Sequence, residues 1–217
     1  AGAKPDPATG ARATPIYQTT SFVFDDADHA ASLFGLKAFG NIYTRIMNPT
    51  QAVLEERIAA LEGGTAALAT ASGHAAQLLV FHTLLKPGEN FVAARKLYGG
   101  SINQFGHAFK NFGWEVRWAE PDDAASFEKQ IDANTRAVFI ESLANPGGEF
   151  VDIKAIADIA HKHGLPLIVD NTLASPYLVR PIEHGADIIV HSLTKFIGGH
   201  GNSIGGILVD GGTFDWS

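Results

Sequence analysis

Short apolar runs alternate with segments of helical periodicity along most of this 217-residue chain. The apolar runs predict strands at residues 66–70, 90–93, 115–118, 137–141, 167–170, 187–191 and 204–209. Helices are expected between them at residues 72–85, 101–112 and 153–163. Strands separated by helices of this length are typical of βαβ units. We therefore expect an α/β fold whose mostly parallel sheet carries helices on both faces.

A further helix is expected before the first strand. Asn48 can cap its start and Gly63 can end it. Between them, Leu54, Ile58 and Leu61 recur at the spacing of one helical face. This pattern predicts an amphipathic helix that buries these three side chains.

The first residues of the chain lack such periodicity. Residues 1–14 are rich in Ala, Gly and Pro, which indicates an extended arm. Residues 15–24 are β-prone and aromatic, and they either dock on another subunit or pack against their own domain. We therefore divide the chain into an N-terminal arm and loop, residues 1–45, and an α/β domain, residues 46–217.

Charge and composition restrict the partners. The chain has 16 basic and 23 acidic residues and a net charge of -7. With no basic block it is not expected to bind nucleic acid or a membrane, which leaves small molecules and protein chains. The absence of cysteine excludes disulfides and thiolate metal sites. No signal pattern occurs and no apolar run reaches the ~20 residues that span a bilayer, so a cytoplasmic location is expected.

Polar residues follow several of the predicted strands directly. In a parallel sheet, ligands bind beyond the carboxyl ends of the strands. The residues at such positions are Ser72-Gly73-His74, Tyr98-Gly99-Gly100, Asn145-Pro146, Asp170-Asn171-Thr172 and Ser192 to Lys195. Because they come from separate strand ends, they predict one shared ligand site.

The stretch 191–206 places a lysine behind two hydroxyl side chains and ahead of a glycine cluster. Lys195 can form a Schiff base with an aldehyde while Ser192 and Thr194 bind an attached phosphate, the combination that pyridoxal phosphate requires. The alternative is a solvated lysine in a glycine-rich turn, and this stretch alone leaves both interpretations open. No dinucleotide fingerprint, Walker lysine motif or zinc motif occurs, so no metal site is predicted.

Four motifs together resemble the Cys/Met-metabolism family of fold-type I pyridoxal-phosphate enzymes. They are PIYQTTSF at 15–22, ASGHAAQ at 71–77, ANPGGE at 144–149 and HSLTKFIGGHGN at 191–202. The resemblance covers nearly the whole chain and implies the large domain of an aspartate-aminotransferase-like fold. It also implies a C-terminal small domain, absent from these 217 residues, that supplies the arginine for the substrate carboxylate.

The resemblance also implies roles for individual residues. Lys195 would carry the cofactor, and Asp170 would pair with the pyridine nitrogen. Tyr98 would stack on the ring, and Asn145 would contact its phenolic oxygen. Thr172 would be a secondary contact.

Other residues match the part of the family's site that holds the cofactor phosphate. Backbone N–H groups of Gly73 and His74, beside Ser72, would bind it together with the hydroxyls of Ser192 and Thr194. The imidazole of His74 is expected to have no chemical role.

Tyr43 and Arg45 match residues that reach the phosphate of a neighbouring subunit's cofactor. The resemblance therefore implies a homodimer or homotetramer with shared active sites, to which the 1–45 segment contributes. The alternative for Arg45 is an ordinary surface arginine.

Within the family, the motifs are most similar to those of the O-acetylhomoserine sulfhydrylase type. This implies γ-replacement, in which O-acetylhomoserine and sulfide or a thiol give homocysteine or methionine and acetate, with Lys195, Tyr98 and Tyr43 as catalytic residues. One alternative is a methionine γ-lyase or a cystathionine γ-synthase or γ-lyase, relatives that usually carry Asp where this chain has Asn202. Another is a non-catalytic fragment that binds pyridoxal phosphate but lacks the substrate domain.

Overall fold

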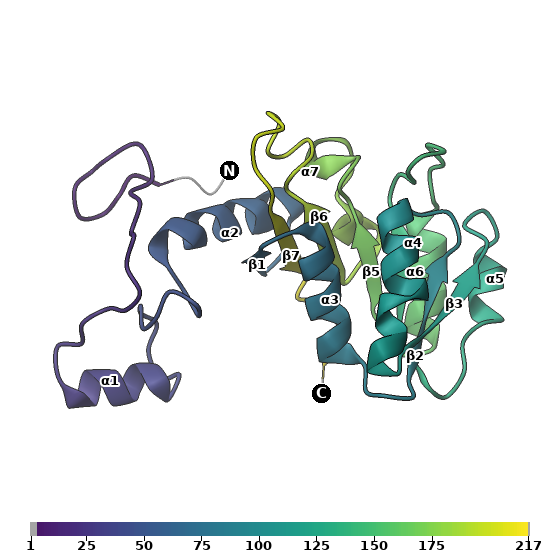
Figure 1. Cartoon of the computed structure of the whole chain (residues 1–217), viewed down its shortest axis with the longest axis horizontal. Helices are drawn as coiled ribbons and strands as arrows, with labels where there is room; N and C mark the ends of the chain where they lie inside the picture. The colour runs from purple at the N-terminus through teal and green to yellow at the C-terminus, as the bar shows by residue number, and fades with distance from the viewer. Residues whose placement is uncertain (1–3, 217) are drawn as a thin grey trace. The chain divides into compact units, whose positions relative to one another are not determined.

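The computed structural model describes residues 4–216, which form two compact units divided between Arg57 and Ile58 (Figure 1). The division falls within helix α2 (Pro49–Glu62). Across the described residues, none of the helices combines the length and the apolar character needed to cross a membrane.

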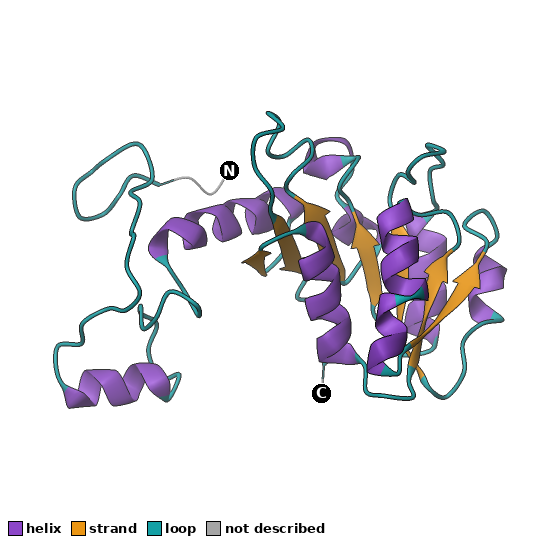
Figure 2. Ribbon diagram, viewed as in Figure 1, coloured by secondary structure: helices purple, strands orange, loops and turns teal. Residues whose placement is uncertain are grey.

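The second unit is built around a seven-stranded sheet with the order β1-β7-β6-β5-β4-β2-β3. Its strands are β1 (Ala66–Thr70), β2 (Asn90–Ala94), β3 (Glu115–Ala119), β4 (Thr135–Glu141), β5 (Leu167–Asp170), β6 (Ile188–Ser192) and β7 (Gly206–Asp210). Only β7 runs antiparallel to its neighbours, β1 and β6. The mostly parallel sheet that the sequence predicts is confirmed, and Figure 2 shows the parallel arrowheads pointing to one edge.

Helices cover both faces of this sheet, as predicted. The second unit contains the helices α3 (Gly73–Leu84), α4 (Gly99–Gly106), α5 (Ala124–Glu128), α6 (Ile153–Lys162) and α7 (Ser175–Leu178), with 3-10 turns at Ala108–Phe112 and Pro181–His184. Figure 1 shows α3 and α4 in front of the sheet and α6 behind it. Both faces of the central strands are therefore shielded from water, which explains why their sequences are continuous apolar runs.

Two details differ from the sequence prediction. The helix expected at 101–112 is interrupted after Gly106, where the chain changes from α-helix to a 3-10 turn. In α2 the buried residues are Ile58, Ala59 and Glu62, whereas Leu54 and Leu61 are 38% and 40% exposed. The predicted buried face was therefore wrong for these two leucines.

An aromatic cluster anchors α3 and α4 to the sheet. The ring of Phe81 on α3 lies 4.1 Å from that of Phe91, 5.3 Å from Phe105, 5.4 Å from Phe109 and 5.9 Å from Phe139. All five rings are buried. Edge-on and tilted contacts of this kind add to the free energy gained by burial, so the cluster fixes the position of α3 on the sheet.

Strand register brings the carboxyl ends of the central strands together. Glu141 at the end of β4 is paired with Asp170 at the end of β5. Asp170 in turn pairs with Val190, two residues before Ser192 at the end of β6. Paired residues on neighbouring parallel strands project from the same face of the sheet. The side chains of Glu141 and Asp170 therefore enter the same space.

Besides the start of α2, the first unit contains the short helix α1 (Ala27–Phe34), which the sequence analysis missed. The Asp26 carboxylate caps it by accepting from the His29 N–H at 2.7 Å. The β-prone stretch 15–24 forms a single bridge, between Ser21 and Tyr43. Further along, the Asn48 side chain accepts from the Thr50 N–H at 2.9 Å, the capping bond expected at the start of α2.

Candidate functional site

A cavity of about 330 Å³ opens at the carboxyl ends of the parallel strands. Every residue of the second unit to which the family resemblance gives a role lines it: Ser72, Gly73, His74, Tyr98, Asn145, Asp170, Thr172, Ser192, Thr194 and Lys195. Their neighbours at the same strand ends, Gly99, Gly100, Pro146, Asn171 and Leu193, are not among the lining residues. The remaining lining residues are Gln77, Glu141, Leu143 and Leu173. Residues far apart in the sequence thus surround one space, while their roles toward a ligand stay predictions.

One wall of the cavity joins the start of α3 to the end of β6. The Ser72 hydroxyl caps α3 by accepting from the Ala75 N–H at 3.1 Å. A Cβ on Gly73 would lie 2.9 Å from the Ser192 Cβ, so glycine permits this close approach. The first N–H groups of a helix have no intrahelical acceptor and attract anions. Two hydroxyl residues, Ser192 and Thr194, line the cavity beside them.

The Asp170 carboxylate lies deeper and is held by neutral donors. One oxygen accepts from the Thr172 N–H at 2.9 Å and the other from the Gln77 side-chain amide at 3.1 Å. Gln77 also donates to the Ser101 hydroxyl at 3.1 Å, which fixes its amide. Within residues 4–216 no basic side chain forms an ion pair with Asp170. The carboxylate is therefore oriented and available to a cationic group of a ligand.

Tyr98 and His74 form an aromatic pair on another side of the cavity. Their ring centroids are 5.9 Å apart and the ring planes are inclined by 29°. A Cβ on Gly100 would collide with both rings, so the glycine allows this stacking. Tyr98 remains 45% exposed and can present a ring face to a ligand.

Glu141 is a cavity residue that the sequence analysis missed. Its side chain accepts from the Tyr98 N–H at 2.7 Å and from the Asn145 N–H at 3.1 Å. Burial, followed by the negative charge of Asp170, raises its pKa to about 8, although the two N–H donors oppose the shift. Its place at the end of an apolar run, like that of Asp170, was the signal that could have identified it.

Gln77 was also missed. It follows Gly73 by one helical turn, so both residues lie on the same side of α3. A glutamine at that spacing, followed directly by the apolar run Leu78 to Phe81, could have indicated a partner at the strand ends.

A buried polar network lies next to these residues along the strands. Glu62 accepts from His191 at 2.5 Å and from the Asn171 amide at 2.9 Å, and the Ser142 hydroxyl donates to Asn171 at 2.8 Å. Ser142, Asn171 and His191 lie at or just beyond the strand ends, and each adjoins a cavity residue in the sequence. Because side chains alternate along a strand, the network lies on the opposite side of the backbone from the cavity.

Tyr43 and Arg45 belong to the first unit. The Arg45 guanidinium carbon lies 5.6 Å from the centroid of the Tyr43 ring, a cation–π contact. Their role toward a neighbouring subunit stays a prediction.

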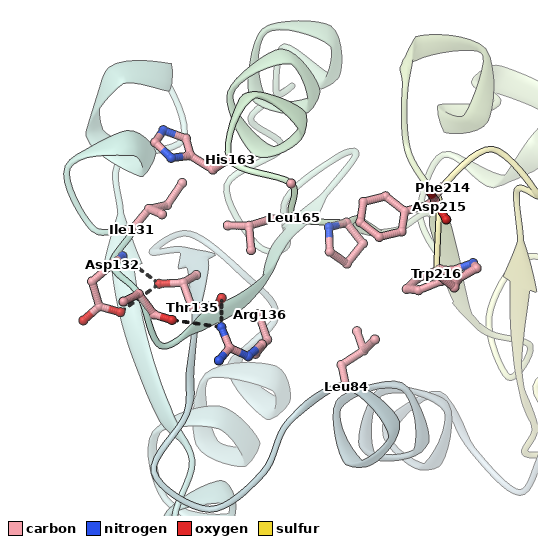
Figure 3. Close-up of a pocket in the computed structure, with 13 residues that line it drawn as sticks. Leu84, Ile131, Asp132, Thr135, Arg136, His163, Leu165, Phe214, Asp215 and Trp216 are labelled. Carbon is pink, nitrogen blue, oxygen red and sulfur yellow. Dashed lines mark hydrogen bonds between the residues drawn. The ribbon is translucent and has the colours of Figure 1, made fainter.

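A larger hollow of about 630 Å³ lies at the opposite ends of the strands (Figure 3). Its charged side chains are already paired. The Arg136 Nε donates to Glu89 at 2.7 Å, and Asp132 lies 2.8 Å from Arg117. Lysine is absent from the described residues that line it. The cavity around Lys195 is therefore the better candidate site.

Comparison with known proteins agrees with this geometry. The model of the family described as Cys/Met metabolism PLP-dependent enzyme matches residues 1–217. An O-acetyl-L-homoserine sulfhydrylase of Leptospira meyeri is 55% identical over 99% of this chain and 49% of its own length. A homocysteine/cysteine synthase of Saccharomyces cerevisiae is 53% identical over 97% of this chain and 48% of its own length.

A solved structure from Campylobacter jejuni, described as an O-acetylhomoserine (thiol)-lyase, superposes with a TM-score of 0.94 at 44% identity. The match covers 97% of this chain and 52% of that one, which carries N′-pyridoxyl-lysine-5′-monophosphate. The chain spans about half the length of the curated relatives it matches. By its sequence and by its fold, this chain belongs to the Cys/Met-metabolism family of pyridoxal-phosphate-dependent enzymes.

Proposed function

We propose that the cavity around Lys195 binds pyridoxal phosphate, the cofactor of the family, through the residues named above. The strongest support is the Asp170 carboxylate, which is held by neutral donors and lines the same cavity as Lys195. A protonated pyridine nitrogen supplies the cation that this carboxylate lacks. The start of α3 at Gly73, with Ser192 and Thr194 nearby, suits the phosphate. These residues therefore fit the cofactor.

We infer that the complete enzyme catalyses γ-replacement, in which sulfide or a thiol and O-acetylhomoserine give homocysteine or methionine and acetate. The bound cofactor supplies an electron sink that stabilises negative charge next to the substrate amine. Relatives at 52–55% identity that carry the names sulfhydrylase and homocysteine synthase support this reaction. The Cγ–O bond breaks and its electrons leave with acetate, while the sulfur nucleophile forms the new Cγ–S bond.

Each residue then has a distinct task. The Lys195 Nζ would hold the cofactor. Its free amine would take the α proton and then a β proton of the substrate and would return both after the sulfur nucleophile has added, so that the product keeps its α and β hydrogens. The Asp170 carboxylate would keep the ring nitrogen protonated. Tyr98 covers one face of the ring, and its hydroxyl, with that of Tyr43 from a neighbouring subunit, assists proton transfer.

We propose that the active site is completed by a second copy of the chain in a homodimer or homotetramer. Tyr43 and Arg45 of one copy would reach the phosphate in the other, where the fork of the Arg45 guanidinium suits a phosphate group. Large exposed apolar side chains of the first unit support an interface there: Ile16, Val23, Phe34, Leu36 and Phe39.

Borohydride reduction followed by peptide mapping tests the cofactor assignment. We expect a pyridoxyl adduct on Lys195 in the wild-type chain and none in Lys195→Ala. An adduct that persists in the variant would disprove the role of Lys195.

The reaction is tested by product analysis. We expect homocysteine and acetate from O-acetylhomoserine and sulfide, whereas a γ-lyase would release ammonia from methionine alone. For the shared site, mixing Arg45→Ala with Lys195→Ala should restore part of the activity, because one site of a mixed dimer is intact. No recovery in mixed dimers would contradict the shared site.

A further inference from the structure

The Glu141 carboxylate connects two loops that both reach the cavity. It lies at the end of β4, is 5% exposed and lines the cavity. One oxygen accepts from the N–H of Tyr98 and the other from the N–H of Asn145. Tyr98 precedes α4, and Asn145 follows β4. A single buried group therefore ties together the backbone of two residues that line the same site.

A carboxylate suits this position better than other side chains. Its two carboxyl oxygens diverge from one carbon, so each can accept from one of two converging backbone N–H groups. Without the Glu141 carboxyl group, the N–H groups of Tyr98 and Asn145 would lose their acceptor. The two loops would then no longer be joined to the same side chain.

We propose that Glu141 is a positioning residue that sets the spacing between Tyr98 and Asn145, and so the width of the slot that receives the cofactor ring. This inference rests on the proposed function, in which Tyr98 covers the ring and Asn145 contacts its phenolic oxygen. Glu141 acts through the backbone of both residues. Its substitution changes how the ring is held and leaves the lysine that carries it in place.

Three variants test whether both acceptor oxygens, at the reach of a glutamate side chain, are needed. Glu141→Ala removes both acceptors. Glu141→Gln keeps the shape but points an NH₂ group at one of the two N–H donors. Glu141→Asp keeps the carboxyl group but is one methylene shorter, so it reaches only one loop.

The matched control is Asp187→Asn, a buried carboxylate before the start of β6. It accepts from the Leu167 N–H at 2.8 Å and from His161 at 2.8 Å, and it does not line the Lys195 cavity. Its substitution therefore removes a similar buried acceptor without touching the site.

The experiment titrates each protein with pyridoxal phosphate. Visible absorbance gives the dissociation constant, and circular dichroism of the bound cofactor reports how rigidly the ring is held. We expect Glu141→Ala and Glu141→Gln to weaken binding about tenfold, the scale of one or two lost hydrogen bonds, and to reduce the dichroic band. Glu141→Asp should be intermediate, and Asp187→Asn should match the wild type in both readouts.

Wild-type affinity and dichroism in Glu141→Gln and Glu141→Ala would overturn the proposal. So would wild-type behaviour of Glu141→Asp, because a carboxyl group that reaches only one loop would then be sufficient. If the wild-type chain forms no Lys195 adduct at all, both this inference and the proposed cofactor site are wrong. If the wild type and the Glu141 variants bind pyridoxal phosphate with the same affinity and dichroism, only the positioning role of Glu141 is wrong and the cofactor site stands.

Discussion

Ionisation of Glu141 should make the stability of the cofactor-free protein depend on pH. Burial and the charge of Asp170 raise the pKa of its carboxyl from 4.5 to about 8. A carboxyl whose pKa is raised on folding stabilises the folded state fully below its unfolded pKa, and this contribution is lost as the pH rises through the folded value. The loss should therefore extend from about pH 4.5 to about pH 8.

The magnitude follows from the same pKa values. Each pKa unit corresponds to about 1.4 kcal/mol, so ionisation of Glu141 should cost on the order of 5 kcal/mol between the two ends of this range. Glu141→Gln cannot ionise. It should be less stable than the wild type at pH 5 by about 1–3 kcal/mol, because one N–H donor loses its acceptor. By pH 9 the difference should vanish or reverse.

Urea unfolding of both proteins at pH 5, 7 and 9 measures this difference. The other titratable groups of the cavity, Asp170, Lys195, Tyr98 and His74, are present in both proteins, so their contributions largely cancel. Parallel stability curves for wild type and Glu141→Gln would refute the reasoning, because Glu141 would then ionise equally in the folded and unfolded chain.

Three further substitutions test the scaffold of the site. Phe81→Ala should cost about 3–5 kcal/mol of unfolding free energy in urea, because it opens a cavity in the aromatic cluster; a loss under 1 kcal/mol would contradict the packing described. Gly73→Ala should weaken pyridoxal phosphate binding in a titration, because its Cβ would lie 2.9 Å from the Ser192 Cβ, whereas Gly106→Ala, where a Cβ meets nothing within 4 Å, should bind normally. Ser72→Ala should lower the unfolding free energy by about 1 kcal/mol through loss of the α3 cap, and an unchanged midpoint would argue against that cap.

The central strands and their ends were predictable from the sequence because a strand that is buried on both faces consists of an unbroken run of apolar residues. The run before Asp170 is an example: Leu167, Ile168 and Val169 are all fully buried. Once the strands were known to be parallel, their carboxyl ends had to meet, so the gathering of Asp170, Ser192 and Tyr98 followed from the topology.

Other features depend on contacts between distant residues. Glu141 accepts its hydrogen bonds from backbone N–H groups. Because almost every residue has such a group, the sequence does not show which of them a side chain will contact. The exposure of Leu54 and Leu61 likewise depends on where α2 finds a neighbour, and periodicity does not encode that. The antiparallel direction of β7 could have been inferred, because no helical pattern separates it from β6.

The position of β7 has a consequence for the order in which the site can assemble during synthesis. In the sheet of the described residues, β1 is bonded to β7 alone, although their sequences lie far apart. Ser72 and Gly73 follow the end of β1 after a single residue, Ala71, so we expect the start of α3 to reach its final place beside Ser192 only after residues 206–210 have emerged and paired. A chain stopped at residue 204 would carry every residue assigned to the cavity and still lack that wall. Non-local pairing of this kind slows folding, so β1 can join this sheet only once β7, more than 130 residues later in the sequence, has been made.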